Sequence, residues 1–249
     1  MKERPILFSG PMVRAILEGR KTQTRRIVKV RSEQPPAWAT FAAEGHSPTY
    51  TSFSKPTGLF YWSEEQPNEG LQKTLRRWPI ESPKHAMAGD HYWTPCPHGA
   101  PGDRLWVRET HDVNRLGIED FPGGRRRYYA GIAYRADDGR HEADITERMY
   151  CTLDEKESRG WTPSIHMPRW ASRITLEITR VRAERLQSIS DADAEAEGVD
   201  FLRHVPDADE TLDARGLFLC LWDGLNAARG HGWDANPWVW AIEFRRIEP

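Results

Sequence analysis

A run of six polar residues at positions 21–26 constrains this chain more than any other feature of the sequence. It holds three cations, two hydroxyls and one amide, with no apolar side chain among them: Lys21, Thr22, Gln23, Thr24, Arg25 and Arg26. A protein core can hold such a run only if every group finds a hydrogen-bonding or charged partner. The run is therefore either a solvated turn or a functional site.

The residues before this run predict a short strand at 6–8 and then a helix. Pro11 suits the first helical turn, where its missing N–H costs little, and Gly19 suits the position after the last turn. Arg20 and Lys21 then lie where the helix dipole favours cations. That is a structural explanation for these two residues, but it leaves the two threonines unexplained. A second strand is expected at 27–30.

Composition limits the class of protein. The 249 residues suffice for one elaborated domain or two small ones, and a net charge of −2 argues against a non-specific nucleic-acid coat but not against a local basic cleft. Three widely spaced cysteines, Cys96, Cys151 and Cys220, indicate a reducing compartment rather than a disulfide framework. Neither a signal-peptide segment nor an apolar run of about 20 residues is present. We expect a soluble cytoplasmic protein with no membrane partner.

Two insertions are expected within the fold. Residues 31–100 lack periodicity and are rich in proline and scattered aromatic residues, with a short hairpin expected around 58–62. Residues 111–165 form the second insertion, in which 128–135 reads as a strand and 137–139 as a hairpin turn leading to a return strand. The arginines at 125–127 are expected to be a solvated face.

Regular elements follow these insertions. Residues 104–108 alternate as a strand, and residues 172–181 alternate strictly, with Ile174, Leu176 and Ile178 facing inward. A helix capped by Ser190 is expected to end at Gly198, which places Glu197 where the helix dipole disfavours an anion. A nearby cation must offset that position. A helix within 207–228 is expected to bury Leu217, Leu221, Leu225, Phe218 and Trp222, and 236–244 forms a closing strand.

Together these pieces resemble the ASCH domain family of the PUA-like superfamily, in particular its larger phage and prophage members. The resemblance rests on the Gly19-Arg20-Lys21-Thr22-x-Thr24-x-Arg26 run, the 102–107 strand, the strand and helix ending at Glu197-Gly198, and the closing strand. It covers less than half of the chain. It implies an α+β fold: one domain over 1–249, a small PUA-like mixed β-barrel with flanking helices and the two loop-rich insertions.

The family includes a bacterial N4-acetylcytidine amidohydrolase, and the motif match implies that Lys21, Thr24 and Glu197 are catalytic here. Amide hydrolysis needs a nucleophile, a base and a stabiliser for the oxyanion. Thr24 would supply the nucleophile, Lys21 the base, and Glu197 a proton shuttle. Positions 21 and 24 face opposite ways in a straight strand, so the trio requires a bend or a turn between them. The alternative is that these residues form a solvated connector.

Other polar and aromatic residues are candidates for binding the substrate. The polar run contributes Arg20, Thr22 and Arg26, and Ser9 could offer a hydroxyl or backbone N–H groups to an anion. The 104–109 strand and the cluster at 161–170 supply side chains that could stack on a base or contact a phosphate. These are Trp106, Arg108, Glu109, His166, Arg169 and Trp170, and for the 161–170 cluster a strand-entry loop with packed indoles is an equal alternative.

A metal site is not expected. His85, His91, Cys96 and His98 could in principle ligate zinc, but their spacing matches no common zinc pattern. No cofactor is implied either. The sequence thus predicts a hydrolase for an amide-linked acyl group on a modified nucleoside or nucleobase, in the cytoplasm of a bacterial host cell if phage-encoded. The alternatives are a non-catalytic reader of RNA or modified nucleotides, and a phage accessory protein that binds a host protein through its insertions.

Overall fold

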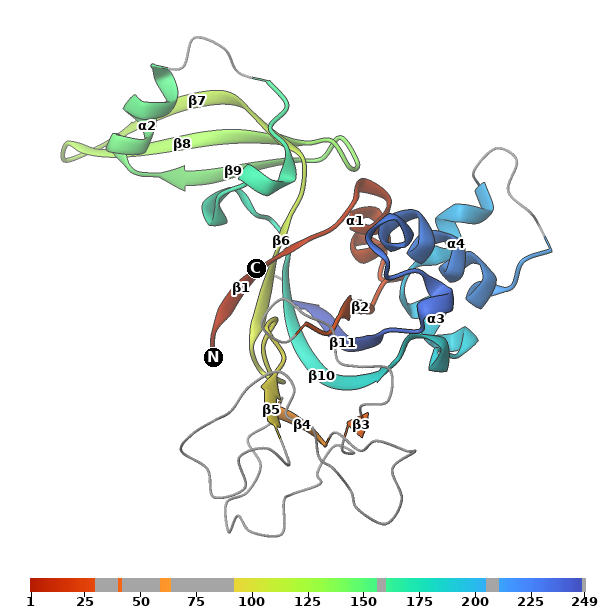
Figure 1. Cartoon of the computed structure of the whole chain (residues 1–249). Coiled ribbons are helices and arrows are strands. Elements are labelled where there is room, and N and C mark those ends of the chain that lie inside the picture. The colour runs from red at the N-terminus through yellow and green to blue at the C-terminus, as the bar shows by residue number, and fades with distance from the viewer. Residues whose placement is uncertain (30–39, 42–58, 64–91, 156–159, 205–210, 248–249) are drawn as a thin grey trace, which may run out of the picture. The chain divides into compact units, whose positions relative to one another are not determined.

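The computed structural model describes residues 1–29, 40–41, 59–63, 92–155, 160–204 and 211–247 (Figure 1). The chain divides into two compact units, and each is described by itself. The first unit comprises Met1–Gly19, Arg104–Glu177 and Arg246–Pro249; the second comprises Arg20–Asp103 and Ile178–Arg245. Both contain helices and strands, so the fold is mixed α+β, and the sheets that the described residues form do not close into a barrel.

The first unit begins with the expected strand and helix. Strand β1 (Glu3–Leu7) pairs in parallel with β6 (Arg104–Arg108), and β6 pairs antiparallel with the start of β10 (Thr175–Arg185). Helix α1 (Gly10–Leu17) buries Met12, Val13, Ala15 and Ile16, and Gly19 has the positive φ of 75° expected after a helix end.

The second insertion is not loop-rich, contrary to expectation. It is a three-stranded antiparallel sheet of β7 (His111–Phe121), β8 (Arg125–Tyr134) and β9 (Arg140–Ile145), followed by α2 (Glu147–Asp154). The sequence predicted β8 and β9 but missed β7, because the polar side chains of β7 alternate poorly on a mostly exposed strand. Gly117 of β7 leaves room for the ring of Tyr129 on β8, since a Cβ at position 117 would overlap that ring.

A small apolar core supports this sheet on one face. Ile132, Tyr134 and Ala143 pack with Met167 and Ala171, and Trp170 lies against them. Met167 and Ala171 come from the 161–172 segment, which forms two short 3₁₀ turns, Ser164–His166 and Arg169–Ala171. This segment therefore has a packing role in the first unit.

In the second unit, β10 pairs with β11 (Trp238–Ile247), and β11 pairs antiparallel with β2 (Gln23–Ile27). Strand β2 was expected at 27–30; it instead begins inside the polar run. A second sheet contains β3 (Thr40–Phe41), β4 (Leu59–Ser63) and β5 (Tyr92–Pro95). The hairpin expected around 58–62 is wrong, because β4 is a single strand whose partners come from residues 40–41 and 92–95.

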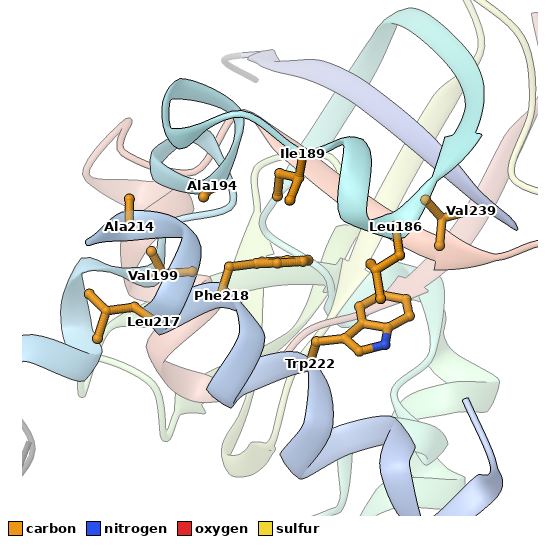
Figure 2. Close-up of a cluster of buried hydrophobic side chains, with 9 residues drawn as sticks. All are labelled: Leu186, Ile189, Ala194, Val199, Ala214, Leu217, Phe218, Trp222 and Val239. Atoms are coloured by element: carbon orange, nitrogen blue, oxygen red, sulfur yellow. The ribbon is translucent and has the colours of Figure 1, made fainter. Parts of the chain in front are cut away.

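Helices cover the second unit's core (Figure 2). The chain forms η3 (Leu186–Ser188), α3 (Asp191–Ala196), η4 (Val199–His204) and α4 (Ala214–Asn226), then η5 (Ala227–Arg229) and η6 (Trp233–Ala235). Leu217, Phe218 and Trp222 of α4 are buried, as predicted. Leu225 is 53% exposed, so the predicted stripe ends one turn earlier than expected.

Candidate functional site

The polar run is anchored at both sides by backbone hydrogen bonds within the second unit. Thr22 N–H donates to the carbonyl oxygen of Ala196 at 2.9 Å, at the end of α3, and Thr22 O accepts from Phe244 N–H of β11 at 2.9 Å. Residues 21 and 22 precede β2, so the chain is not yet a regular strand at Lys21. The run is therefore held between the end of α3 and β11 rather than left as a solvated turn.

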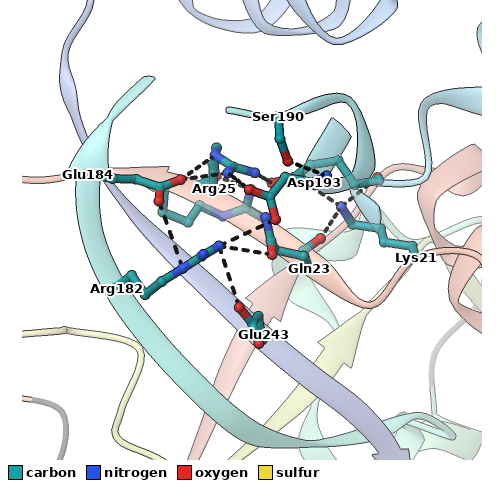
Figure 3. Close-up of polar contacts among 10 residues, drawn as sticks. Lys21, Gln23, Arg25, Arg182, Glu184, Ser190, Asp193 and Glu243 are labelled. Atoms are coloured by element: carbon teal, nitrogen blue, oxygen red, sulfur yellow. Dashed lines mark hydrogen bonds and ion pairs between the residues drawn. The ribbon is translucent and has the colours of Figure 1, made fainter. Parts of the chain in front are cut away.

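Lys21 is almost completely buried, with an exposed fraction of 2%, and its ammonium makes three hydrogen bonds (Figure 3). It donates to Glu197 Oε2 at 2.9 Å, to the Glu197 carbonyl oxygen at 2.8 Å and to the Gln23 carbonyl oxygen at 2.7 Å. An ammonium has three donors, so this geometry satisfies the group fully. Lys21 and Glu197 thus lie together, as a catalytic pair would require; their roles stay a prediction.

Glu197 is the C-cap residue of α3 and is 3% exposed. The dipole at a helix end disfavours an anion, and the structure supplies the offsetting cations that this position requires. Lys21 binds one carboxylate oxygen, and Arg25 Nη1 lies 3.2 Å from the other, Oε1. Gly198 follows with a φ of 75°, which ends the helix there.

Arg25 links this pair to further carboxylates. Its side chain is fully buried; Nε donates to Glu184 Oε1 at 3.1 Å, and Nη2 lies 2.5 Å from the same oxygen and 3.3 Å from Asp193 Oδ2. The guanidinium also lies 5.8 Å from the centre of the Phe218 ring. Arg25 therefore joins the polar cluster to the apolar core of the second unit.

Burial lowers the pKa of Lys21. The Glu197 carboxylate opposes this shift by favouring the charged ammonium, while the positive charges of Arg26 and Arg25 add to it. A lysine that must lose a proton to act as a base benefits from such a shift. Burial likewise lowers the pKa of Arg26, which is half-buried and donates through Nη1 to the Arg25 carbonyl oxygen at 3.1 Å.

Thr24 lies in β2 opposite Ile242 and is 1% exposed. Side chains alternate along a strand, so Thr24 faces away from Gln23 and Arg25. The Gln23 carbonyl that accepts from Lys21, however, belongs to the peptide bond between Gln23 and Thr24. The ammonium therefore lies beside the backbone of Thr24.

The same contacts have a second, structural reading. In the β2–β11 ladder, the Thr22 carbonyl and the Val28 N–H bond to β11, so the even-numbered residues of β2 face that strand. The carbonyls of Gln23 and Arg25 face the free edge. They are capped by Lys21 Nζ and by Arg26 Nη1. Capping by long cationic side chains is one way to protect an edge strand.

The remaining candidates of the polar run are more exposed. Arg20 lies 3.8 Å from Asp200 in a surface ion pair, and Thr22 is exposed. Such a surface pair contributes little to stability. Both residues belong to the same unit as Lys21 and remain candidates for substrate contact.

Seven candidates belong to the first unit. Ser9 is the N-cap of α1, although its side chain makes no capping bond, and His166 is exposed at the end of a 3₁₀ turn. Trp170 packs against the apolar core of that unit. The other four have contacts inside the first unit: Trp106 with Arg108, Arg108 with the Met167 and Ile165 carbonyls, Arg169 with Glu3, and Glu109 with Arg173.

Glu109 is the most constrained of these. It is 2% exposed and receives two hydrogen bonds from Arg173, Nε to Oε1 at 3.0 Å and Nη2 to Oε2 at 2.9 Å. Arg173 also binds Asp137 and lies 3.9 Å from the centre of the Tyr134 ring. Burial raises the pKa of Glu109, and Arg173 opposes that shift. The residue forms a buried structural ion pair.

Sequence reasoning missed most of the polar cluster in the second unit. Arg182 and Glu184 of β10, Asp193 of α3 and Glu243 of β11 all take part in it. The alternation of Ile174, Leu176 and Ile178 does not extend to Arg182 and Glu184, because Arg180 is exposed and Val181 is buried. The sequence pattern of β10 therefore gave no direct signal for the polar cluster.

The zinc alternative involves residues that are only partly described. His85 and His91 lie outside the described residues, and Cys96 is buried. Within the described ranges, no three His, Cys, Asp or Glu side chains are grouped as a metal site would need. None of the described helices combines the length and apolar character needed to cross a bilayer.

Comparison of the chain with protein-family models, with curated proteins and with solved structures found no match.

Proposed function

We propose that this protein is a hydrolase that removes an acyl group from an amide nitrogen of a modified nucleoside or nucleobase, with N4-acetylcytidine as the representative substrate. One observation carries the proposal. The buried Lys21 ammonium bonds to Glu197 and to the Gln23 carbonyl oxygen, so a lysine and a carboxylate lie together beside the backbone of Thr24.

The chemistry assigns one role to each residue. Neutral Lys21 accepts the proton of the Thr24 hydroxyl as its oxygen attacks the acyl carbon. The carbon–nitrogen bond then breaks, and the nucleobase amine leaves with a proton delivered through Lys21 and Glu197. Water next attacks the acyl-threonine and releases the carboxylic acid. The net reaction is amide plus water to acid plus amine.

Lys21 must be neutral for the first step. The lowered pKa of the buried ammonium supports this requirement, and the Glu197 carboxylate works against it. Glu197 divides its two oxygens between Lys21 and Arg25, so part of its charge is already compensated. Arg25 therefore reduces the extent to which Glu197 stabilises the protonated form of Lys21.

We also propose a relationship to the ASCH and PUA-like proteins. Its support is the order of elements: α1, the polar run and β2, then β6, then β10 with α3, and β11 at the end. The PUA-like barrel, a single domain and a cytoplasmic location belong to the same proposal. Three widely spaced cysteines are compatible with a reducing compartment.

The competing explanation is that Lys21 and Arg26 only protect the free edge of β2. This explanation needs no hydroxyl at position 24, whereas the hydrolase requires one. Thr24→Val keeps the shape and burial of the side chain and removes only the hydroxyl. Activity lost in this variant, with an unchanged thermal midpoint, would separate catalysis from edge protection.

The test is incubation of the purified protein with N4-acetylcytidine, with cytidine measured by chromatography and acetate by proton NMR. Wild type should release both in equal amounts, and Thr24→Val, Lys21→Met and Glu197→Gln should each lower kcat by at least about 100-fold. Thr179→Val is the matched control, since Thr179 is an exposed threonine of β10 outside the cluster, and it should retain full activity.

A non-catalytic binding module would give a different result. Wild type would then release no acetate, and it would bind RNA or the modified nucleoside without changing it. Binding of neither, with capture of a purified host protein instead, would favour the accessory-protein alternative. Either result would overturn the hydrolase proposal.

A further inference from the structure

The charged residues of the polar cluster in the second unit differ in how deeply they are buried. Side chains of Lys21, Arg25 and Glu197 are 0%, 0% and 4% exposed and form its floor. Side chains of the four other charged residues are 18–32% exposed and form its rim: Arg182, Glu184, Asp193 and Glu243. The rim residues are therefore the members of the cluster that solvent reaches most easily.

The two arginines of the cluster differ in how firmly they are held. Arg25 has contacts as short as 2.5 Å, as described above. Arg182 Nη2 has only long contacts to carboxylates, 3.4 Å to Asp193 Oδ1 and 3.4 Å to Glu243 Oε1. Its Nε is buried and has no hydrogen-bond acceptor within the described part of the chain; Glu184 Oε2 lies 3.8 Å away. A buried donor without an acceptor is costly unless a ligand uses it.

The side-chain amide of Gln23 does not supply the acceptor that Arg182 lacks. In one orientation its oxygen lies 3.3 Å from Arg182 Nη2. In the opposite orientation its nitrogen donates to Asp193 Oδ1 at 3.2 Å and its oxygen accepts from Arg25 Nη1 at 2.6 Å. The second orientation satisfies both ends of the amide, and amide orientation is assigned by such networks. Among the described residues, Arg182 then contacts only the carboxylates of Glu184, Asp193 and Glu243.

The charges around Arg182 select the kind of acceptor it can take. Carboxylates of Glu184, Asp193 and Glu243 all lie within 3.8 Å of its guanidinium. An incoming phosphate or carboxylate would meet three like charges, which costs free energy at these distances. A neutral carbonyl oxygen accepts a hydrogen bond without that cost.

We infer that Arg182 is the residue of this site that binds the substrate, through a hydrogen bond from its guanidinium to a neutral carbonyl oxygen of the nucleobase or of its acyl group. The identity of the substrate rests on the proposed function, whereas the hydrogen bond from Arg182 does not. Arg182 supplies a binding contact that the trio of Lys21, Thr24 and Glu197 lacks. The three rim carboxylates exclude anionic ligands from the same position.

The contact is tested directly by NMR of wild-type protein labelled with nitrogen-15. The Nε–H signal of Arg182 is assigned by its loss in Arg182→Lys, and the protein is then titrated separately with N4-acetylcytidine, cytidine and sodium acetate. N4-acetylcytidine should shift this signal and acetate should not. In steady-state assays Arg182→Gln should raise KM about tenfold or more with a much smaller change in kcat, because the contact forms in the ground state. Arg180→Gln, a change of an exposed arginine on the same strand, should leave both unchanged.

The outcomes separate this inference from the proposed function. A shift by N4-acetylcytidine without turnover would support the Arg182 contact and overturn the hydrolase. Turnover with no shift of the Arg182 signal, and a KM unchanged in Arg182→Gln, would overturn the Arg182 contact alone. A shift by acetate as large as that by N4-acetylcytidine would overturn the selection of a neutral acceptor. If Arg182→Gln fails to fold, the wild-type titration still decides.

Discussion

The Lys21 ammonium lies 2.9 Å from the Glu197 carboxylate, although 176 residues separate the two in sequence. Both groups are buried, and each has partners for its remaining hydrogen-bonding capacity. A buried pair of this kind tolerates the loss of one partner poorly, because the other charge is left uncompensated. The stability of the second unit should therefore depend on Lys21 whether or not the residue is catalytic.

Replacing Lys21 by methionine tests this dependence. Lys21→Met should lower the free energy of unfolding by about 3–5 kcal/mol, because Glu197 loses its closest cation and two buried carbonyls lose their donor. Urea denaturation followed by circular dichroism measures the change. Lys29→Met, the same substitution at an exposed lysine, should change stability by less than about 0.5 kcal/mol. If both substitutions changed the free energy of unfolding by the same amount, the stabilising role of the buried Lys21–Glu197 pair would be contradicted.

Asp193 should make stability depend on pH in the acid range. Burial acts to raise its pKa, but the positive charges of Arg25 and Arg182 outweigh burial and hold the pKa below its ordinary value of 3.8. The unfolded chain therefore takes up a proton first as the pH falls. The stabilisation by Asp193 is complete above the pKa that Asp193 has in the unfolded chain. It is lost as the pH falls through the pKa that Asp193 has in the folded protein.

The measurement is the unfolding free energy between pH 7 and pH 3 for wild type and Asp193→Asn. The difference between the two proteins should shrink as the pH falls through this range. For Asp234→Asn, a change at an exposed aspartate, the unfolding free energy should differ from that of wild type by the same amount at every pH. A difference that is independent of pH would rule out the ion pairs of Asp193 as its origin.

The ion pair of Arg173 and Glu109 makes a prediction for the first unit. Arg173→Met should destabilise the protein by about 3–5 kcal/mol, since Glu109 is left as an unpaired buried carboxylate. The double variant Arg173→Met, Glu109→Leu should recover part of this loss, because no buried charge remains. Thermal and urea denaturation of both variants measure the recovery. A double variant less stable than Arg173→Met would contradict the argument.

Gly117 gives a prediction about packing on the open face of the β7–β8–β9 sheet. A Cβ at this position overlaps the Tyr129 ring, so Gly117→Ala should cost about 1–3 kcal/mol as the ring is displaced. Gly224 of α4 is the control, because a Cβ built there meets no described atom within 4 Å apart from its chain neighbours and the backbone of its own helix. Gly224→Ala should stabilise by about 0.5–1 kcal/mol through helix propensity. Equal effects at the two positions would show that Tyr129 does not occupy the space above Gly117.

Local chemistry explains which elements the sequence could predict. Pro11, Ser190 and the residues with positive φ at Gly19 and Gly198 mark the ends of α1 and α3, so both helices were predicted correctly. Strand β2 was placed too late because its first residues are polar, and only tertiary partners from β10, α3 and β11 make that composition compatible with burial.

The polar cluster was harder to predict than the elements that carry it. Lys21 could be linked to Glu197 through the family resemblance, and the position of Glu197 at a helix end already required a cation nearby. Arg182 and Glu243 come from different strands, and nothing local in either strand indicates the other. Their contact depends on the order β10-β11-β2, which the sequence pattern did not specify.

The proposed hydrolase requires that Thr24 attacks the acyl group with the help of Lys21, and trapping of the acyl-enzyme tests this step. Wild-type protein is mixed with N4-acetylcytidine, quenched in acid within the first turnovers, digested, and analysed by peptide mass spectrometry. We expect an acetyl group on Thr24 in wild type and none in Lys21→Met. Release of acetate by wild type with Thr24 unmodified, and equally fast release by Thr24→Val, would contradict it.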